Sequence, residues 1–296
     1  MKYTKYQRNI LLSIITFSSF VRADTRIESQ EILESMRGGE AIIFQNIMIT
    51  GDLDFTELCY KISTLPEKEE TIMEKVLGFF VEINIKENQE VQCDIEVPIE
   101  FMGYTFQDRV IGWINDEKNE VSYNAIFHND IIFTNCNFKD DFLFKYSKFN
   151  GKADLSENNF NNIVLLKYAE FRQPVSFAES IFTKEANFKY TNFPQGTTFI
   201  KSQFKSTANF KYTNIEEFVD FSETSFNGEA NFKYTKFPKG VSFENSTFSE
   251  NANFKYAEFS QPVNLEGTHF NGDTDFKYTT IGGEEFVKYL LNAKID

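Results

Sequence analysis

The sequence predicts an all-β solenoid with four sides per coil, and two observations on its 296 residues support this fold. Large apolar residues recur from Phe127 to Ile281 at spacings that alternate between six and five. A helix would place such residues three and four apart, and a simple strand would alternate them by twos. The phrase FKY or LKY also returns every 22 residues from Phe144 to Phe276. A fixed period of this size is typical of stacked structural repeats.

Each coil of 22 residues contains four of these apolar positions, so each side contributes one large inward side chain. The regular part then has seven coils, with a height of ~34 Å at the usual strand spacing. Of the 29 inward positions, 24 are Phe, which explains the high Phe content without any ligand. A small or β-branched residue stands two positions earlier, as Ala186 does before Phe188. We expect small and large side chains to share the interior without voids.

This pattern resembles the pentapeptide-repeat family, whose unit reads Ala-(Asp/Asn)-(Leu/Phe)-x-x. ADLSE begins at Ala153, and ANFKY begins at Ala186, Ala208, Ala230 and Ala252. The resemblance implies a right-handed quadrilateral β-helix. This chain departs from the family unit because every second unit carries one extra residue. We place the extra residue at corners rich in Pro and Gly, which favour turns.

The N-terminal residues 1–23 have the layout of a secretory signal peptide cleaved after Ala23. Lys2, Lys5 and Arg8 form a positive head before a short apolar run. A retained anchor or a buried helix is the alternative. We therefore expect a secreted or envelope protein, with no transmembrane segment after cleavage.

The rest of the chain divides into a cap, a regular part and a terminal helix. Residues 24–122 are expected to form an N-terminal cap with degenerate first coils. Residues 123–281 form the regular solenoid, and residues 282–296 hold a capping helix. Atypical ends are expected because a bare solenoid end would expose its core and unpaired strand edges.

Two of the three cysteines, Cys59 and Cys93, lie in the cap and could form a disulfide in an exported protein. Two separate buried thiols are the alternative. Cys136 occupies a small interior position before Phe138 and is expected to be a buried free thiol. Asn245 begins an Asn-Ser-Thr sequon and is a candidate N-glycosylation site.

The sequence contains none of the common catalytic or phosphate-binding motifs. Its two histidines, His128 and His269, lie 141 residues apart, and we expect no nucleophile or ligand partner beside either. The cysteine spacing does not match a zinc site. We therefore expect no catalytic residue, no metal and no cofactor. A glycan-active β-helix enzyme is the lowest-ranked alternative.

Residues one coil apart should stack into columns at about 4.8 Å. One tight corner then carries paired columns of lysine and tyrosine, which we name the Lys/Tyr ladder. The diagonal corner is expected to be acidic, through Glu157, Glu179, Glu223, Glu244 and Glu266, with Lys201 as the one basic residue. The ladder consists of Lys145, Tyr146, Lys167, Tyr168, Lys189, Tyr190, Lys211, Tyr212, Lys233, Tyr234, Lys255, Tyr256, Lys277 and Tyr278.

Two interpretations of the ladder remain open. Tandem duplication alone would copy its residues from coil to coil. Alternatively, the ladder docks a partner, such as an acidic cell-surface polymer, a glycan, another protein or the acidic edge of a second copy in a homodimer. Either way, the expected function is a non-enzymatic exported scaffold at the cell envelope.

The family resemblance also implies a rival function, because some pentapeptide-repeat proteins resemble duplex DNA and inhibit DNA gyrase. Such mimicry needs a negatively charged column. The whole chain has a formal net charge of −14, but residues 123–281 hold 16 basic and 19 acidic residues, a net charge of −3. Inhibition of a topoisomerase is therefore the alternative, and we do not expect a nucleic-acid partner.

Overall fold

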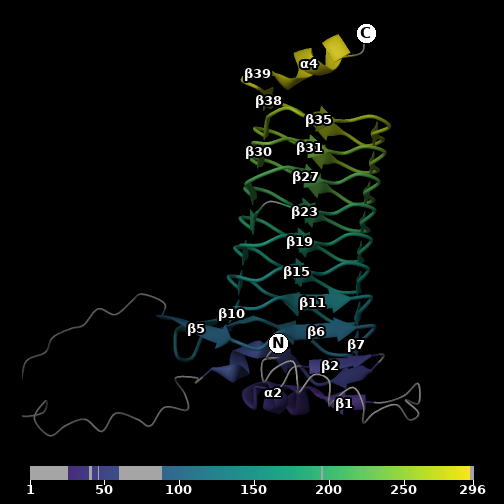
Figure 1. Cartoon of the computed structure of the whole chain (residues 1–296). Coiled ribbons are helices and arrows are strands. Elements are labelled where there is room, and N and C mark those ends of the chain that lie inside the picture. Colours follow the sequence, from purple (N-terminus) through teal and green to yellow (C-terminus); the bar gives the residue numbers. More distant parts are fainter. Residues whose placement is uncertain (1–25, 40–41, 46, 60–88, 195, 294–296) are drawn as a thin grey trace, which may run out of the picture.

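The computed structural model confirms the predicted four-sided β-helix and describes residues 26–39, 42–45, 47–59, 89–194 and 196–293. Figure 1 shows a straight tube of stacked coils, with α2 at its N-terminal end and α4 at its C-terminal end. The predicted signal peptide and its cleavage site at Ala23 lie outside the described residues.

Four sheets form the four sides of the tube, and we number the sides in chain order from β14 onward. Their pairing is parallel except for β9 with β10 and β38 with β39. Side I contains β5 (Gln89–Ile95), β9 (Trp113–Asp116), β10 (Val121–Phe127), β14 (Lys148–Phe149), β18 (Glu170–Phe171), β22 (Asn192–Phe193), β26 (Asn214–Ile215), β30 (Lys236–Phe237), β34 (Glu258–Phe259), β38 (Thr280–Ile281) and β39 (Glu284–Glu285). Side II contains β2 (Ile42–Gln45), β6 (Ile99–Met102), β11 (Ile131–Thr134), β15 (Ala153–Asp154), β19 (Val175–Ser176), β23 (Thr197–Thr198), β27 (Val219–Asp220), β31 (Val241–Ser242) and β35 (Val263–Asn264).

The other two sheets complete each coil. Side III contains β1 (Arg26–Glu28), β3 (Met48–Thr50), β7 (Thr105–Phe106), β12 (Asn137–Phe138), β16 (Asn159–Phe160), β20 (Ile181–Phe182), β24 (Gln203–Phe204), β28 (Ser225–Phe226), β32 (Thr247–Phe248) and β36 (His269–Phe270). Side IV contains β4 (Leu53–Asp54), β8 (Val110–Ile111), β13 (Phe142–Leu143), β17 (Val164–Leu165), β21 (Ala186–Asn187), β25 (Ala208–Asn209), β29 (Ala230–Asn231), β33 (Ala252–Asn253) and β37 (Thr274–Asp275).

Strand register confirms the 22-residue coil, since Phe149 of β14 pairs with Phe171 of β18. The inward rings stack along each side. On side III the ring centroids of Phe160, Phe182 and Phe204 are separated by 5.0 and 4.6 Å, with planes within 10° of parallel. These rings are almost completely buried. The interior is therefore a set of phenylalanine columns, and apolar burial holds the coils together.

The tube has two kinds of corner, as the alternating spacing predicts. Wide corners hold the extra residue, for example residues 172–174 between β18 and β19. At tight corners the chain makes a β-turn, in which the Thr213 N–H donates to the Phe210 carbonyl at 3.1 Å. Tyr212, the third residue of this turn, has φ 59°, as a type II turn requires. The preceding Asn209 side chain accepts from the Lys211 N–H at 3.2 Å, which starts the turn.

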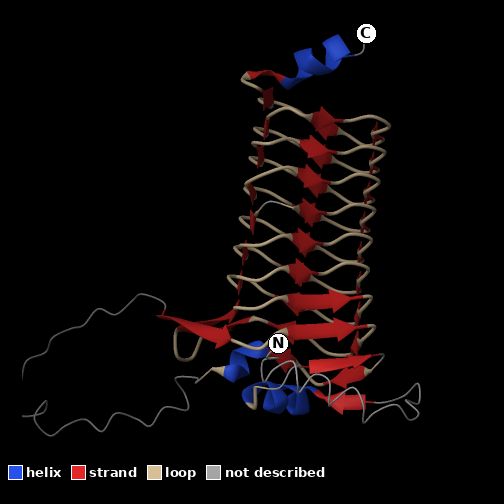
Figure 2. Ribbon diagram, in the orientation of Figure 1, coloured by secondary structure: helices blue, strands red, loops and turns tan. Residues whose placement is uncertain are grey.

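The N-terminal end of the tube is covered by α2 (Ser29–Arg37) and the 3₁₀ helix η1 (Phe55–Leu58). Ile32, Leu33 and Met36 of α2 are buried against the end of the core. Figure 2 shows α2 lying across this end. The four sheets continue into this region, so its coils belong to the same tube.

The C-terminal end is covered less completely by α4 (Phe286–Ala293). Phe286 is buried and stacks on Phe259, with ring centroids 4.7 Å apart. Phe270 and Phe276 of the last coil stay partly exposed. None of the helices in the described part of the chain is both long and apolar enough to cross a bilayer.

Candidate binding surface

All seven predicted tyrosines form one stack at the corner between side IV and side I. Neighbouring ring centroids are 4.7 to 5.0 Å apart. The planes lie within 6° of parallel from Tyr146 to Tyr256. Because the strand register fixes the corners, the rings repeat at the height of one coil.

The lysines run beside the tyrosine stack. Each Nζ lies 4.6 to 5.4 Å from the ring centroid of the next residue, within the range of cation–π attraction. Partial burial and the neighbouring Lys167 ammonium lower the pKa of Lys145. Within the described ranges, no acidic side chain forms an ion pair with any of the seven amines. The ladder is therefore a straight row of positive charges, and no carboxylate of the described residues is paired with any of them.

A third column on side IV adds hydrogen-bond donors. The amide oxygens of Asn209, Asn231 and Asn253 accept from the backbone N–H of the lysine two residues later. Their Nδ2 groups have no partner among the described residues. Each of these coils therefore offers an amide, an ammonium and a phenol hydroxyl to solvent, all of which can donate a hydrogen bond.

Stacking leaves the edges of the tyrosine rings as their contact surface. Each interior ring has a neighbour on both faces, so a ligand beside the column meets edges and hydroxyl groups. Tyr278, the last ring, is 59% exposed and has one open face. Recognition along the column must therefore use charge and hydrogen bonds rather than stacking on a ring face.

The N-terminal end of the ladder is closed by Trp113, which the sequence analysis missed. Lys145 Nζ lies 4.4 Å from the Trp113 ring centroid and 4.6 Å from that of Tyr146. Trp113 Nε1 donates to Ser122 Oγ at 2.8 Å. Trp113 stands in the antiparallel hairpin of β9 and β10, outside the 22-residue period. No periodic signal could therefore have placed it beside the ladder.

The diagonal corner, between sides II and III, holds the expected residues, but at two different positions of the turn. Glu157, Glu179, Lys201 and Glu223 share the left-handed turn position, with φ 57° to 58°. The next two residues in this column are Asn245 and Gly267. Glu244 and Glu266 lie in the turns of this corner, as expected, but one residue before the left-handed position. The left-handed conformation favours Gly and Asn, which explains the neutral residues. Asn245 is exposed there, and its glycosylation stays a prediction.

The histidines lie on opposite parts of the surface. His269 is exposed on β36. His128 Nε2 lies 2.7 Å from Asp94 Oδ1 and 3.8 Å from Glu96 Oε1, so the expectation that it has no ligand-type neighbour was wrong. The strand pairing of β5 with β10 brings these exposed groups together. Within the described ranges, no cluster of His, Cys, Asp and Glu is suited to a metal ion.

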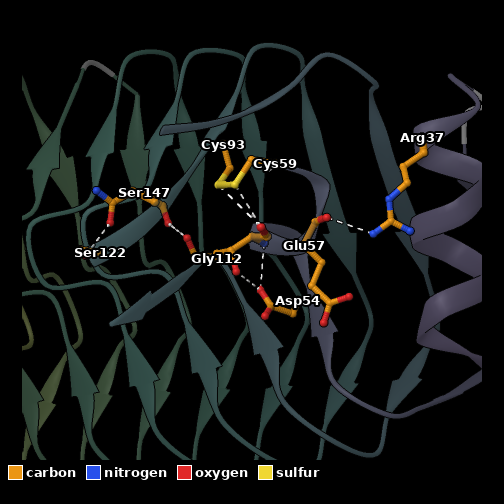
Figure 3. The surroundings of a disulfide bond; sticks show 10 residues. Arg37, Asp54, Glu57, Cys59, Cys93, Gly112, Ser122 and Ser147 are labelled. Carbon is orange, nitrogen blue, oxygen red and sulfur yellow. Dashed lines mark hydrogen bonds between the residues drawn. A yellow bond between two sulfur atoms is a disulfide. The ribbon is translucent and has the colours of Figure 1, made fainter. Parts of the chain in front are cut away.

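The three cysteines differ in oxidation state, because two form a disulfide and one is a free thiol. Cys59 and Cys93 form a disulfide between the end of η1 and β5, as Figure 3 shows. Nearby, the Arg37 guanidinium donates to the Glu57 carbonyl at 3.0 Å, which ties α2 to η1. Cys136 is buried and free, and burial raises the pKa of its thiol to about 12.

A comparison with protein-family models matches pentapeptide repeats (9 copies) to residues 166–214 and 210–258. Searches of curated proteins and of solved structures found no match. The matched region contains the ladder from Lys167 to Tyr256 and has the Ala-Asn-Phe units and the four-sided coils described above. Solenoids of this kind are generally non-enzymatic. The chain is therefore a pentapeptide-repeat protein.

Proposed function

We propose that the protein is a non-enzymatic exported scaffold at the cell envelope, and that its Lys/Tyr ladder docks an extended acidic partner. The observation that carries this proposal is the straight row of seven amines, repeated at one coil height. The stacked rings and parallel strands hold the row rigid. A rigid surface loses little conformational entropy when it binds, which favours affinity.

Divergence elsewhere in the same coils argues against simple copying. The outward residues on side III vary along the tube, from Asn137 and Asn159 through Ile181, Gln203, Ser225 and Thr247 to His269. The ladder positions keep Lys and Tyr throughout. Duplication without selection would leave all sides equally alike, so the uniform corner supports a function.

The backbone conformation of the tyrosines supports the same conclusion. A left-handed conformation costs about 1–2 kcal/mol for a residue with a side chain, and Gly or Asn avoids most of this cost. The opposite corner has accepted Asn245 and Gly267 at this position. The ladder corner keeps Tyr in all seven coils, with φ 59° to 63°.

A triple substitution tests binding by the ladder. We expect Tyr190, Tyr212 and Tyr234 changed to Ser to abolish co-sedimentation of the full chain with native envelope material. The matched control changes Glu179, Lys201 and Glu223 to Ser, at the same turn position on the opposite corner. Circular dichroism checks that both variants keep the fold. Equal retention of the two variants would contradict the proposal.

Export is tested separately. Fractionation of the native cells should place the protein outside the cytoplasm, and N-terminal sequencing should start at Asp24. A cytoplasmic protein that begins at Met1 would contradict the export part of the proposal.

A further inference from the structure

We infer that the partner of the Lys/Tyr ladder is a linear acidic polysaccharide with one anionic group on nearly every sugar ring, such as a polyuronate. This inference rests on the proposed binding function and names the class of polymer. It follows from the geometry of the row, from the groups beside it and from the surface that the stacked rings leave open.

The charge on the ladder is a single line rather than a patch. Its rings repeat every 4.7 to 4.9 Å along one corner, and one lysine stands beside each ring. Amide side chains flank the central part of this corner, with Asn209 and Asn231 on side IV and Asn192 and Asn214 on side I. Outside these central coils, the same outward position on side I carries Lys148, Glu170, Lys236 and Glu258. The central coils therefore present a line of charge between neutral polar margins, and a single polymer chain lying parallel to the tube axis fits there.

Nucleic acids fit this surface poorly. The phosphates of duplex DNA wind around its axis with one turn in about 34 Å. The ladder is straight and spans about 29 Å at six strand spacings, so a duplex would bring only part of one turn against it. Single-stranded nucleic acids bind through bases stacked on open aromatic faces. On the ladder those faces are covered by neighbouring rings.

The side-chain spacing of an acidic polypeptide does not match the spacing of the ladder. Side chains on one face of an extended chain repeat at roughly 6.7 Å, which differs from the spacing of the rings. An extended pyranose chain instead advances by nearly one coil height per ring. Successive rings turn about the chain axis, so the carboxylates that face the ladder recur after a whole number of rings. Each of them can lie against an ammonium, while the rings between them present hydroxyl groups to the ladder.

The hydrogen-bond donors beside each amine can bind the hydroxyl groups of a sugar as well as its carboxylate. Asn209 Nδ2, Lys211 Nζ and Tyr212 Oη belong to one coil, and the same three types recur in the next two coils. Carboxylates and sugar hydroxyls both accept hydrogen bonds from such groups, and bonds to a charged acceptor are the stronger ones. A polyuronate can therefore satisfy both the charge and the hydrogen-bonding groups along the ladder.

The experiment measures binding of the full chain to polygalacturonate, to its methyl-esterified form, to polyglutamate and to duplex DNA. We expect polygalacturonate to bind at least about tenfold more tightly than the other three, a difference that affinity measurements resolve readily. With oligogalacturonates of increasing length, affinity should rise and level off near seven rings, the number of amines in the ladder.

Matched lysine variants locate the site. Changing Lys189, Lys211 and Lys233 to Gln should weaken binding to polygalacturonate by about tenfold or more. Changing Lys184, Lys201 and Lys205 to Gln removes the same charge from other corners and should leave affinity nearly unchanged. Equal losses in both variants would contradict the assignment to the ladder.

These measurements distinguish failure of the proposed function from failure of the polysaccharide assignment. If the chain binds none of the polyanions and none of the envelope material, the proposed function fails and this inference fails with it. If polyglutamate or DNA binds as tightly as polygalacturonate through the same lysines, or affinity does not level off with length, the polysaccharide assignment alone is overturned.

Discussion

Buried hydroxyl groups tie each tight corner to the preceding coil. Thr191, Thr213 and Thr235 are buried, and each donates to the carbonyl of the residue 25 positions earlier at 2.6 to 3.0 Å. Ser180 and Ser202 do the same at the diagonal corner, at 2.8 Å. The sequence pattern identified these positions as small, but only the structure shows why many carry a hydroxyl.

We therefore expect Thr213→Val, which keeps the shape but removes the donor, to lower the free energy of unfolding. The loss should be about 0.5–1.5 kcal/mol, the usual net contribution of one hydrogen bond. The Phe188 carbonyl is not left unsatisfied, because it still accepts from the Thr191 N–H at 3.0 Å. Urea denaturation measures it. Thr247→Val, on the outward face of β32, is the control and should change stability by less than about 0.5 kcal/mol. Similar losses in both would contradict the role of the buried hydroxyl.

The left-handed tyrosines set backbone strain against ring stacking. Replacing Glu223 by Asn relieves strain without removing a stacked ring, so we expect it to stabilise the protein by about 1 kcal/mol. Tyr212→Asn relieves the same strain but removes two stacking contacts of about 0.5–1.5 kcal/mol each. It should therefore be neutral or destabilising in the same denaturation assay. Equal stabilisation by both would show that stacking contributes nothing.

The buried thiol of Cys136 makes stability depend on pH at the alkaline end. Burial raises its pKa from 9.0 to about 12 in the folded protein. The unfolded chain therefore releases this proton at lower pH, so stability falls as pH rises from 9.0 towards about 12. Cys136→Ala should flatten this part of the stability profile, measured by urea denaturation. An unchanged slope would contradict the buried protonated thiol.

At the scale of elements, the disulfide joins η1 to β5 across a sequence separation of 34 residues. Closing a loop of this size stabilises a protein by roughly 3–4 kcal/mol in the chain-entropy model. We expect changing Cys59 and Cys93 to Ser to destabilise the chain by about this amount. Thiol titration of the denatured, unreduced protein should find one reactive thiol, that of Cys136. Three thiols would contradict the pairing.

The sequence predicted the regular sides well because spacing alone determines which residues point inward. A five-residue step marks a tight corner, and a six-residue step marks a wide one. The sequence assigned Glu244 and Glu266 to the correct corner, but the 22-residue period leads from Glu223 to Asn245 and Gly267 at the left-handed position. Trp113 and the carboxylates beside His128 depend on pairing between segments that do not repeat. Such contacts leave no periodic signal.

The whole molecule is a rigid tube with unlike edges and unlike ends. One corner carries the Lys/Tyr ladder, while the diagonal corner is discontinuously acidic. The nearly neutral regular column lacks the continuous negative surface that mimicry of DNA needs. We therefore expect the full chain not to inhibit supercoiling by DNA gyrase, which a plasmid supercoiling assay measures. Potent inhibition would contradict this charge argument.

The most direct test of the central claim is the salt dependence of polygalacturonate binding by the full chain. If the row of amines makes the contact, affinity should fall steeply as salt concentration rises, because exposed charges are screened. Changing Lys189, Lys211 and Lys233 to Gln should make this dependence clearly shallower, while the Lys184, Lys201 and Lys205 control should keep the original slope. Identical slopes for all three proteins would contradict the account.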